Sequence, residues 1–164
     1  ELRNPKLAEK LKWELDRFDL EPRRLSIEIL ENVVAETDND VVVANIAALA
    51  KLGCGIDLDD FGTGQASLSM LSKLPVDKIK LDRSFLKDIP HNPVQVRLVQ
   101  SVIQLAAALQ LKLVVEGVET DIQRRFLIKL GCKQMQGYFF AKPAPVAYWL
   151  KHLKAARVNR AVTL

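Results

Sequence analysis

The sequence predicts an α/β fold, a TIM-like (β/α) barrel that lacks its N-terminal strands and keeps about five strand–helix units. Two observations predict it. Segments with apolar residues at every second position alternate along the chain with segments whose apolar residues recur at helical spacing. In strand after strand, one parity is aliphatic, as at Ile56 and Leu58, and the other is polar, as at Asp57 and Asp59.

The one-sided polarity of the strands decides between two architectures. Strand–helix repeats imply parallel strands with right-handed crossovers, which build either an open doubly wound sheet or a barrel. An open sheet buries both faces under helices, whereas a barrel has helices outside and a lumen inside. We therefore favour the barrel. Five units do not close eight strands, so we expect residues 1–164 to form one partial domain without roughly the first third of the barrel.

Helices are expected where apolar residues recur three or four positions apart, at about 7–18, 40–52, 66–74, 94–110, 122–130 and 146–156. The first carries Leu7, Leu11 and Leu15 on one face. Gly53 and Gly131 follow two of the others, because glycine readily adopts the left-handed conformation that ends a helix.

Strands are expected between these helices, at 24–30, 54–60, 78–82, 112–118 and 133–139. Each is short and alternates aliphatic with polar residues. In the first, Ile27 and Ile29 share one face and Glu28 lies on the other, which is typical of a strand with one polar face.

The composition is that of an ordinary globular domain. Apolar residues make up 49% of the 164 positions and charged residues 27%, which excludes a disordered chain. The net charge of +4 is spread along the chain, so we expect no DNA partner. Cys54 and Cys132 are far apart and are expected to be reduced. No segment is long enough to span a membrane and no signal peptide is visible, so we expect a cytoplasmic protein, or the cytoplasmic piece of a longer one.

Polar residues at the C-terminal ends of the five predicted strands form one constellation. There is one from each strand, and together they are Glu28, Asp59, Lys80, Glu116 and Gln136. Carboxylates brought to one barrel mouth repel each other unless cations are bound, and oxygen ligands favour Mg²⁺ or Mn²⁺ over zinc. Asp60 follows Asp59 directly and is placed to meet a second ion. Two such cations are the usual device for displacement at phosphorus.

The loop "FGTGQASL" follows the aspartate pair. Gly62 and Gly64 permit positive φ and close backbone approach, so the loop can fold tightly beside a metal site. Glu31 lies just beyond the first predicted strand and is expected to accept hydrogen bonds from this loop.

Four stretches carry a family resemblance: "IEILE", "DLDDFGTGQASLSMLSKLPVDKIKLDRSF", "LVVEGVET" and "QMQGYFFAKP". In this order they resemble the motifs of the EAL domain family, the cyclic di-GMP phosphodiesterases of bacterial signalling. The resemblance implies a TIM-like barrel that uses Mg²⁺ or Mn²⁺ to hydrolyse one phosphodiester bond of cyclic di-GMP, giving linear pGpG.

The resemblance also implies roles for the strand-end residues. The implied metal ligands are Glu28, Asp59, Asp60 and Glu116. The implied catalytic residues are Glu116 as a base, Lys80 as the holder of the attacking water or a phosphate oxygen, and Gln136 as the residue that orients the water.

Two further acids match family positions outside this set. Glu31 matches the second acid of the first strand-end motif, which supports the loop at Gly62 and Gly64, and Glu119 matches the second acid of "EGVE". Leu30, Gln65 and Val115 differ from the usual family residues. The Glu-Ala-Leu tripeptide and an asparagine ligand are expected upstream of residue 1, so the chain is either a piece of an intact domain or a truncated protein without a full metal site.

Asp57 is not supplied by the resemblance, because the family usually has a small residue at this position. Lys78 has the same parity one strand over. Since an unpaired buried carboxylate is costly, we expect Asp57 to pair with Lys78.

The sequence thus favours a metal-dependent cyclic di-GMP phosphodiesterase. The alternatives are a receptor that binds cyclic di-GMP without cleaving it, and a scaffold that only dimerises. Open sheet edges lead us to expect a homodimer or larger oligomer. Fused sensor or GGDEF-type domains are expected in the full-length protein.

Overall fold

The computed structural model describes residues 1–35, 40–64, 71 and 73–151. Within them, one five-stranded parallel sheet runs in the order β1-β2-β3-β4-β5. Its strands are β1 (Ser26–Leu30), β2 (Gly55–Phe61), β3 (Lys78–Leu81), β4 (Lys112–Val115) and β5 (Gln134–Met135). Every neighbouring pair is parallel and consecutive in the chain. A doubly wound sheet reverses its strand order at a switch point, so the observed order confirms the barrel-type arrangement.

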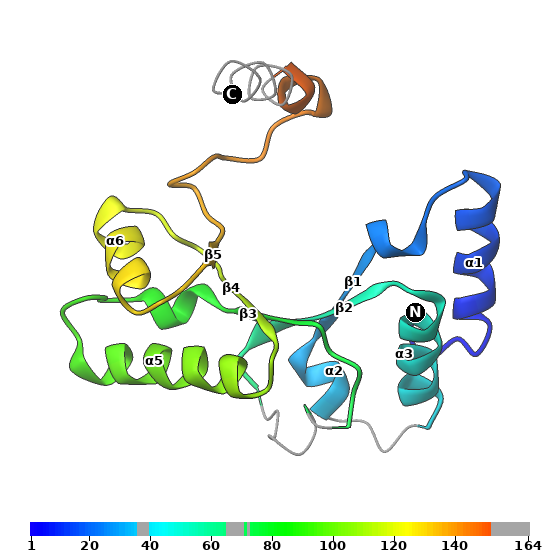
Figure 1. Ribbon diagram of the computed structural model, residues 1–164, viewed down its shortest axis with the longest axis horizontal. Helices are drawn as coiled ribbons and strands as arrows, with labels where there is room; N and C mark the ends of the chain where they lie inside the picture. The colour runs from blue at the N-terminus through cyan, green and yellow to red at the C-terminus, as the bar shows by residue number, and fades with distance from the viewer. Residues whose placement is uncertain (36–39, 65–70, 72, 152–164) are drawn as a thin grey trace.

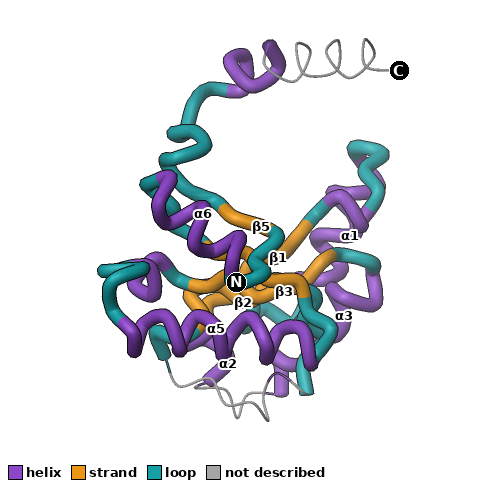
Figure 2. Tube along the Cα trace, turned by 60° about the vertical axis from the view of Figure 1, so that its left-hand side comes forward, coloured by secondary structure: helices purple, strands orange, loops and turns teal. Residues whose placement is uncertain are grey.

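Helices cover one side of this sheet. They are α1 (Leu7–Arg17), α2 (Glu31–Ala35), α3 (Asp40–Leu52), α5 (Pro93–Ala108) and α6 (Asp121–Lys129), with 3₁₀ turns η1 (Pro22–Arg24) and η2 (Arg83–Leu86). In Figure 1, α2, α3 and α5 lie beneath the strands, α1 packs beside α3, and α6 lies at the other end. Figure 2 shows the same one-sided layering from a second direction.

The aliphatic parity of the strands forms the core against these helices. Ile56, Leu58, Ile79 and Leu81 are almost completely buried, and they pack in one cluster with residues of α3, α5 and α6. Burial of each such side chain contributes about 1.5–3 kcal/mol relative to exposure. The polar parity lies on the opposite face of the sheet, as predicted.

The expected boundaries hold closely for the helices that the sequence predicted and less well for the last two strands, and α2 was not predicted. Ladder pairing in β4 ends at Val115, before Gly117, whose φ of +68° turns the chain. β5 is two residues long, yet the amide of Gln136 still donates to Val115 O at 2.9 Å. The helix expected at 66–74 falls mostly outside the described residues, and residues 146–151 are helical as expected.

One irregularity of the sheet bears directly on function. Asp57 pairs with Lys78 and Leu58 with Ile79, but the next pair is Phe61 with Leu81. Asp59 and Asp60 therefore both lie opposite the single residue between Ile79 and Leu81, which makes a β-bulge. None of the described helices is long and apolar enough to cross a membrane.

Candidate active site around Lys80

Lys80 lies at the centre of a group of acids on the polar face of the sheet. Its Nζ atom is 2.9 Å from Glu28 Oε1, 2.9 Å from Asp59 Oδ1 and 2.9 Å from Glu116 Oε1. These acids come from β1, β2 and the residue after β4, so three neighbouring segments converge on one ammonium. The lysine side chain is only 9% exposed. The structure thus brings together four of the five residues of the predicted constellation.

The charge of this lysine is held in place by its surroundings. Burial alone lowers the pKa of Lys80, but its contacts with Glu28, Asp59 and Glu116 outweigh burial, and the pKa of the ammonium lies above its ordinary value. Lys80 is therefore a cation at neutral pH. Its side chain can donate hydrogen bonds, but it cannot act as a base.

The β-bulge brings Asp60 to the same place. An unbroken strand would direct Asp59 and Asp60 to opposite faces, but Asp60 has a φ of 54° and leaves the regular strand conformation. Carboxylate oxygens of Asp59, Asp60 and Glu116 all lie within 4.8 Å of one another. We call Glu28, Asp59, Asp60, Lys80 and Glu116 the acid cluster.

The acid cluster fits a hard divalent cation. It has four carboxylates and one ammonium, so negative charge is in excess. Burial first, and then repulsion from Asp59, Asp82 and Glu31, raises the pKa of Asp60 in spite of Lys80. The buried Oδ1 atom of Asp59 has an ionic contact with Lys80 but no aligned hydrogen bond among the described residues. Several carboxylate oxygens within reach of one another are the donor set that Mg²⁺ or Mn²⁺ prefers.

Glu31 holds the loop beside the acid cluster, as the sequence predicts. Its Oε2 atom accepts hydrogen bonds from the Gly62 amide at 2.7 Å and from the Gly64 amide at 3.2 Å, and the residue is 2% exposed. Gly62 has a φ of +93°, and a Cβ atom there would lie 2.4 Å from the ring of Phe85. Only glycine satisfies both constraints at this position.

Gln136 and Glu119 are not joined to the acid cluster. Gln136 is exposed, and its backbone pairs with Val115 and Val118, so it lies near the strand end that carries Glu116. Glu119 is also exposed, and its amide donates to Gln123 Oε1 at the start of α6. Neither side chain has a hydrogen bond or ion pair within the described residues.

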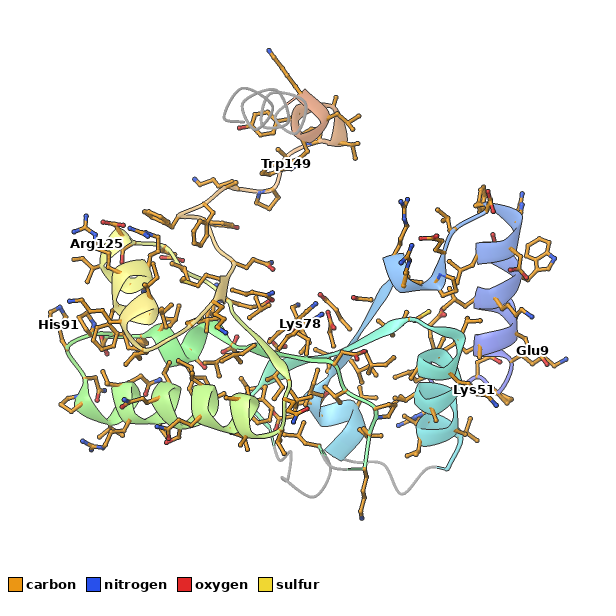
Figure 3. All side chains as sticks on the ribbon, viewed as in Figure 1. Glu9, Lys51, Lys78, His91, Arg125 and Trp149 are labelled. Carbon is orange, nitrogen blue, oxygen red and sulfur yellow. The ribbon has the colours of Figure 1, made fainter. Side chains whose placement is uncertain are left out.

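Asp82 is a site neighbour that sequence reasoning did not select. It follows β3, its carboxylate accepts a hydrogen bond from the Ser84 amide at 2.9 Å, and its charge helps to raise the pKa of Asp60. The signal was present, because Asp82 continues the polar parity of Lys78 and Lys80. Figure 3 places His91 at the outer end of α5, far from Lys78 at the sheet, which agrees with its exclusion from the site.

The family follows from a direct match. The model of the EAL domain matches residues 1–143 of the chain. The chain belongs to the EAL domain family. This match covers every residue of the acid cluster, together with Glu31 and the glycine loop.

Curated relatives of this EAL domain are longer proteins. RocR of Pseudomonas aeruginosa, named a cyclic di-GMP phosphodiesterase, is 41% identical over 146 residues, which cover 89% of this chain and 37% of the relative. MucR of the same organism, named a bifunctional diguanylate cyclase/cyclic di-GMP phosphodiesterase, is 38% identical over 139 residues, covering 85% of this chain and 20% of the relative. The chain thus spans well under half the length of either protein.

Solved EAL structures share the fold. A structure of the PaMucR phosphodiesterase in complex with c-di-GMP superposes with a TM-score of 0.81 at 37% identity, covering 88% of this chain and 58% of that one. A manganese/cy-diGMP complex of Klebsiella pneumoniae BlrP1 superposes with a TM-score of 0.76 at 31% identity, covering 83% of this chain and 35% of that one. The five-stranded sheet is therefore part of a TIM-like barrel.

Proposed function

We propose that this EAL domain hydrolyses cyclic di-GMP to linear pGpG with the help of Mg²⁺ or Mn²⁺. One observation carries the proposal: three carboxylates contact a single ammonium and a fourth lies beside them, so that one positive charge meets four negative ones. The names of RocR and MucR, and the nucleotide in the PaMucR complex, support cyclic di-GMP as the substrate. The BlrP1 complex supports Mn²⁺ as one usable metal.

Glu28, Asp59, Asp60 and Glu116 would hold the metal. Bound there, it would supply a more acidic water and neutralise charge on the phosphodiester. The chain's own residues have separate tasks. Glu116 accepts the proton of the attacking water, and Lys80, a donor at every relevant pH, holds that water or a phosphate oxygen.

The remaining assigned residues act around this centre. The water oxygen forms a new bond to phosphorus while the bond from phosphorus to the departing sugar oxygen breaks, and that oxygen takes up a proton from solvent to become the free hydroxyl of linear pGpG. Gln136, at the neighbouring strand end, is proposed to orient the water. Glu31 holds the loop at Gly62 and Gly64 against the metal side of the site. Among the residues that the structure describes, Glu119 has no contact that supports a role in these steps, and its assignment rests on the motif alone.

A receptor that binds cyclic di-GMP without cleaving it is the competing function. A receptor needs no uncompensated carboxylates, because an anionic nucleotide is repelled by them. The excess negative charge of the acid cluster therefore favours the enzyme.

The test is hydrolysis by the full-length protein with Mg²⁺ or Mn²⁺, followed by chromatography of cyclic di-GMP and pGpG. Glu116→Gln keeps the shape of the side chain and is expected to lower kcat by about 10²-fold or more, the usual effect of losing a general base. Glu9→Gln, on the exposed face of α1, is the matched control and should leave kcat unchanged.

Each outcome assigns a function. Turnover that is lost in Glu116→Gln and kept in Glu9→Gln supports the phosphodiesterase. Tight calorimetric binding of cyclic di-GMP by an inert wild-type protein with both metals would establish the receptor instead.

Assembly and location remain predictions. The bifunctional MucR supports the expected fusion to GGDEF-type domains in the full-length protein. A homodimer or larger oligomer and a cytoplasmic location are still expected from the sequence.

A further inference from the structure

A second carboxylate–lysine contact lies one step before the acid cluster on the same two strands. Lys78 Nζ donates a hydrogen bond to Asp57 Oδ2 at 2.5 Å. The Asp57 side chain is 4% exposed and the Lys78 side chain 24%. A carboxylate buried to this extent is costly without a cationic partner, so the two side chains depend on each other.

We propose that the Asp57–Lys78 pair is a positioning device that fixes the β2–β3 register and thereby sets Asp59 and Asp60 for a divalent cation. The inference rests on the metal site proposed above. It assigns a role to two residues that the family motifs leave without one. Neither residue belongs to the acid cluster.

The aliphatic face of the two strands cannot set this register by itself. On β2, Ile56 and Leu58 alternate with period two, and Ile79 and Leu81 do the same on β3. A slip of two residues therefore keeps aliphatic side chains on the buried face. Burial distinguishes one-residue slips from the native pairing, but it distinguishes two-residue slips poorly.

The charged face does distinguish them. Asp57 and Asp59 are two residues apart on β2, and Lys78 and Lys80 are two residues apart on β3. In the native register, Asp57 meets Lys78 and Asp59 meets Lys80. A two-residue slip brings one aspartate to the wrong lysine and leaves the other aspartate and the other lysine unpaired. Only the native register satisfies both pairs.

The position of the pair makes register matter for the site. Asp57 pairs with Lys78, and one further pair, Leu58 with Ile79, follows before the β-bulge. The ladder resumes at Phe61 and Leu81. The bulge is where the ladder lacks regular pairing. There Asp59 contacts Lys80, and a carboxylate oxygen of Asp60 comes within 4.8 Å of oxygens of Asp59 and Glu116. A fixed contact two residues before Asp59 keeps the extra residue of the bulge at Asp59–Asp60.

The neighbours of Lys78 leave it no other acid. On β4, its register partner is Lys112, which carries the same charge. Within the described part of the chain, Asp57 is the one acid at ion-pair distance from Lys78. The pair is therefore specific in both directions.

The experiment measures Mn²⁺ binding to the full-length protein by calorimetry, independently of turnover. Asp57→Asn and Lys78→Met each remove one charge, and Asp57→Asn/Lys78→Met removes both, so that no unpaired charge is buried if a single variant fails to fold. Lys78→Arg keeps the pair, and Lys51→Met on the exposed end of α3 is the control.

We expect the Kd for Mn²⁺ to rise about 10–100-fold in the double variant, the usual cost of losing a residue that orients metal ligands. Lys78→Arg and Lys51→Met should stay within about threefold of wild type. Amide exchange at Gly62, which is bonded to Glu31, should accelerate in the double variant, because the bulge is no longer fixed.

A double variant that binds Mn²⁺ as wild type does and melts at a lower temperature would show a purely structural pair and overturn the inference. A wild-type protein that does not bind Mn²⁺ overturns it as well. A protein that binds Mn²⁺ but does not cleave cyclic di-GMP refutes the proposed hydrolysis and leaves this test intact.

Discussion

Lys78 and Lys80 lie two residues apart on one face of β3, yet their surroundings differ in charge. Lys78 meets one aspartate, and the two form a closed pair. Lys80 meets three acids, and a fourth, Asp60, lies beside them. The first arrangement is complete as it stands. The second leaves negative charge that the chain does not neutralise.

The balance of charge distinguishes a structural ion pair from a functional one. A buried pair of equal and opposite charges is satisfied by its own hydrogen bonds and needs no ligand. A group of partly exposed acids around one buried ammonium keeps an excess of negative charge, which an added cation would neutralise. The imbalance around Lys80, rather than its burial, indicates the metal site.

Removing the Lys80 charge is expected to have the largest effect on activity. Lys80→Met keeps the length of the side chain but leaves the carboxylates without an ammonium, and we expect kcat to fall roughly 10²–10³-fold, the usual effect of losing one group that stabilises charge in the transition state. The thermal melt in EDTA should also shift to lower temperature, and Mn²⁺ should restore it.

The control for this variant is Lys51→Met, an exposed lysine on α3. Equal activity of Lys80→Met and wild type would remove Lys80 from the catalytic set. An unchanged melt in EDTA would show that the four acids do not repel each other in the folded protein.

The sequence predicted this site well where period-two alternation applies. Alternation placed Glu28, Asp59 and Lys80 on one face, and the parallel order of the strands brought them to one end of the sheet. The contact of Asp57 with Lys78 followed from the same parity and from the cost of a buried charge. These are local rules that need no knowledge of the rest of the chain.

Where alternation is interrupted, parity alone was a poorer guide. Parity assigns Asp60 to the helix side, whereas its position directly after Asp59 at the strand end predicted that it joins the site. The bulge, with a φ of 54° at Asp60, turns it to the acid cluster. The ends of β4 and β5 depend on Gly117 and Gly137, where a Cβ atom would collide with Arg83 and with the backbone of Val118, so tertiary packing requires glycine there. Such packing is not encoded in a repeating pattern.

Glu31 offers a second test, in which the acid holds the backbone instead of a metal. Glu31→Gln keeps one acceptor oxygen but loses the charge that strengthens the bonds to the amides of Gly62 and Gly64. Hydrogen bonds to a charged group contribute about 1.5–3 kcal/mol each, so we expect a loss of about 2 kcal/mol in the free energy of unfolding and a smaller loss of kcat than in Lys80→Met.

Urea denaturation and steady-state kinetics check this prediction, with Glu9→Gln as the control. A variant with wild-type stability and activity would show that the loop does not depend on the Glu31 charge. A kcat as low as that of Lys80→Met would instead place Glu31 in the chemistry.

Asp60→Asn is expected to have the smallest effect, because it removes one charge from the acid cluster and keeps the backbone conformation. Asparagine also tolerates the left-handed conformation. The pKa of Asp60 is raised above its ordinary value, so the folded state holds the proton more tightly than the unfolded state does. The ionised Asp60 carboxylate therefore lowers the free energy of unfolding once the pH is high enough to remove its proton.

In EDTA, Asp60→Asn should melt near the wild-type temperature at pH 3 and slightly above it at pH 7, where the wild type carries the charge. With Mn²⁺ at pH 7 the order should reverse, since the variant has lost a metal ligand. Asp88→Asn is the matched control, because Asp88 is exposed and has a similar φ of 61°. A gain at pH 7 shared by both variants would reflect the backbone conformation. A higher melting temperature confined to Asp60→Asn would show that the charge of Asp60 destabilises the metal-free protein, as expected for a residue kept for metal binding.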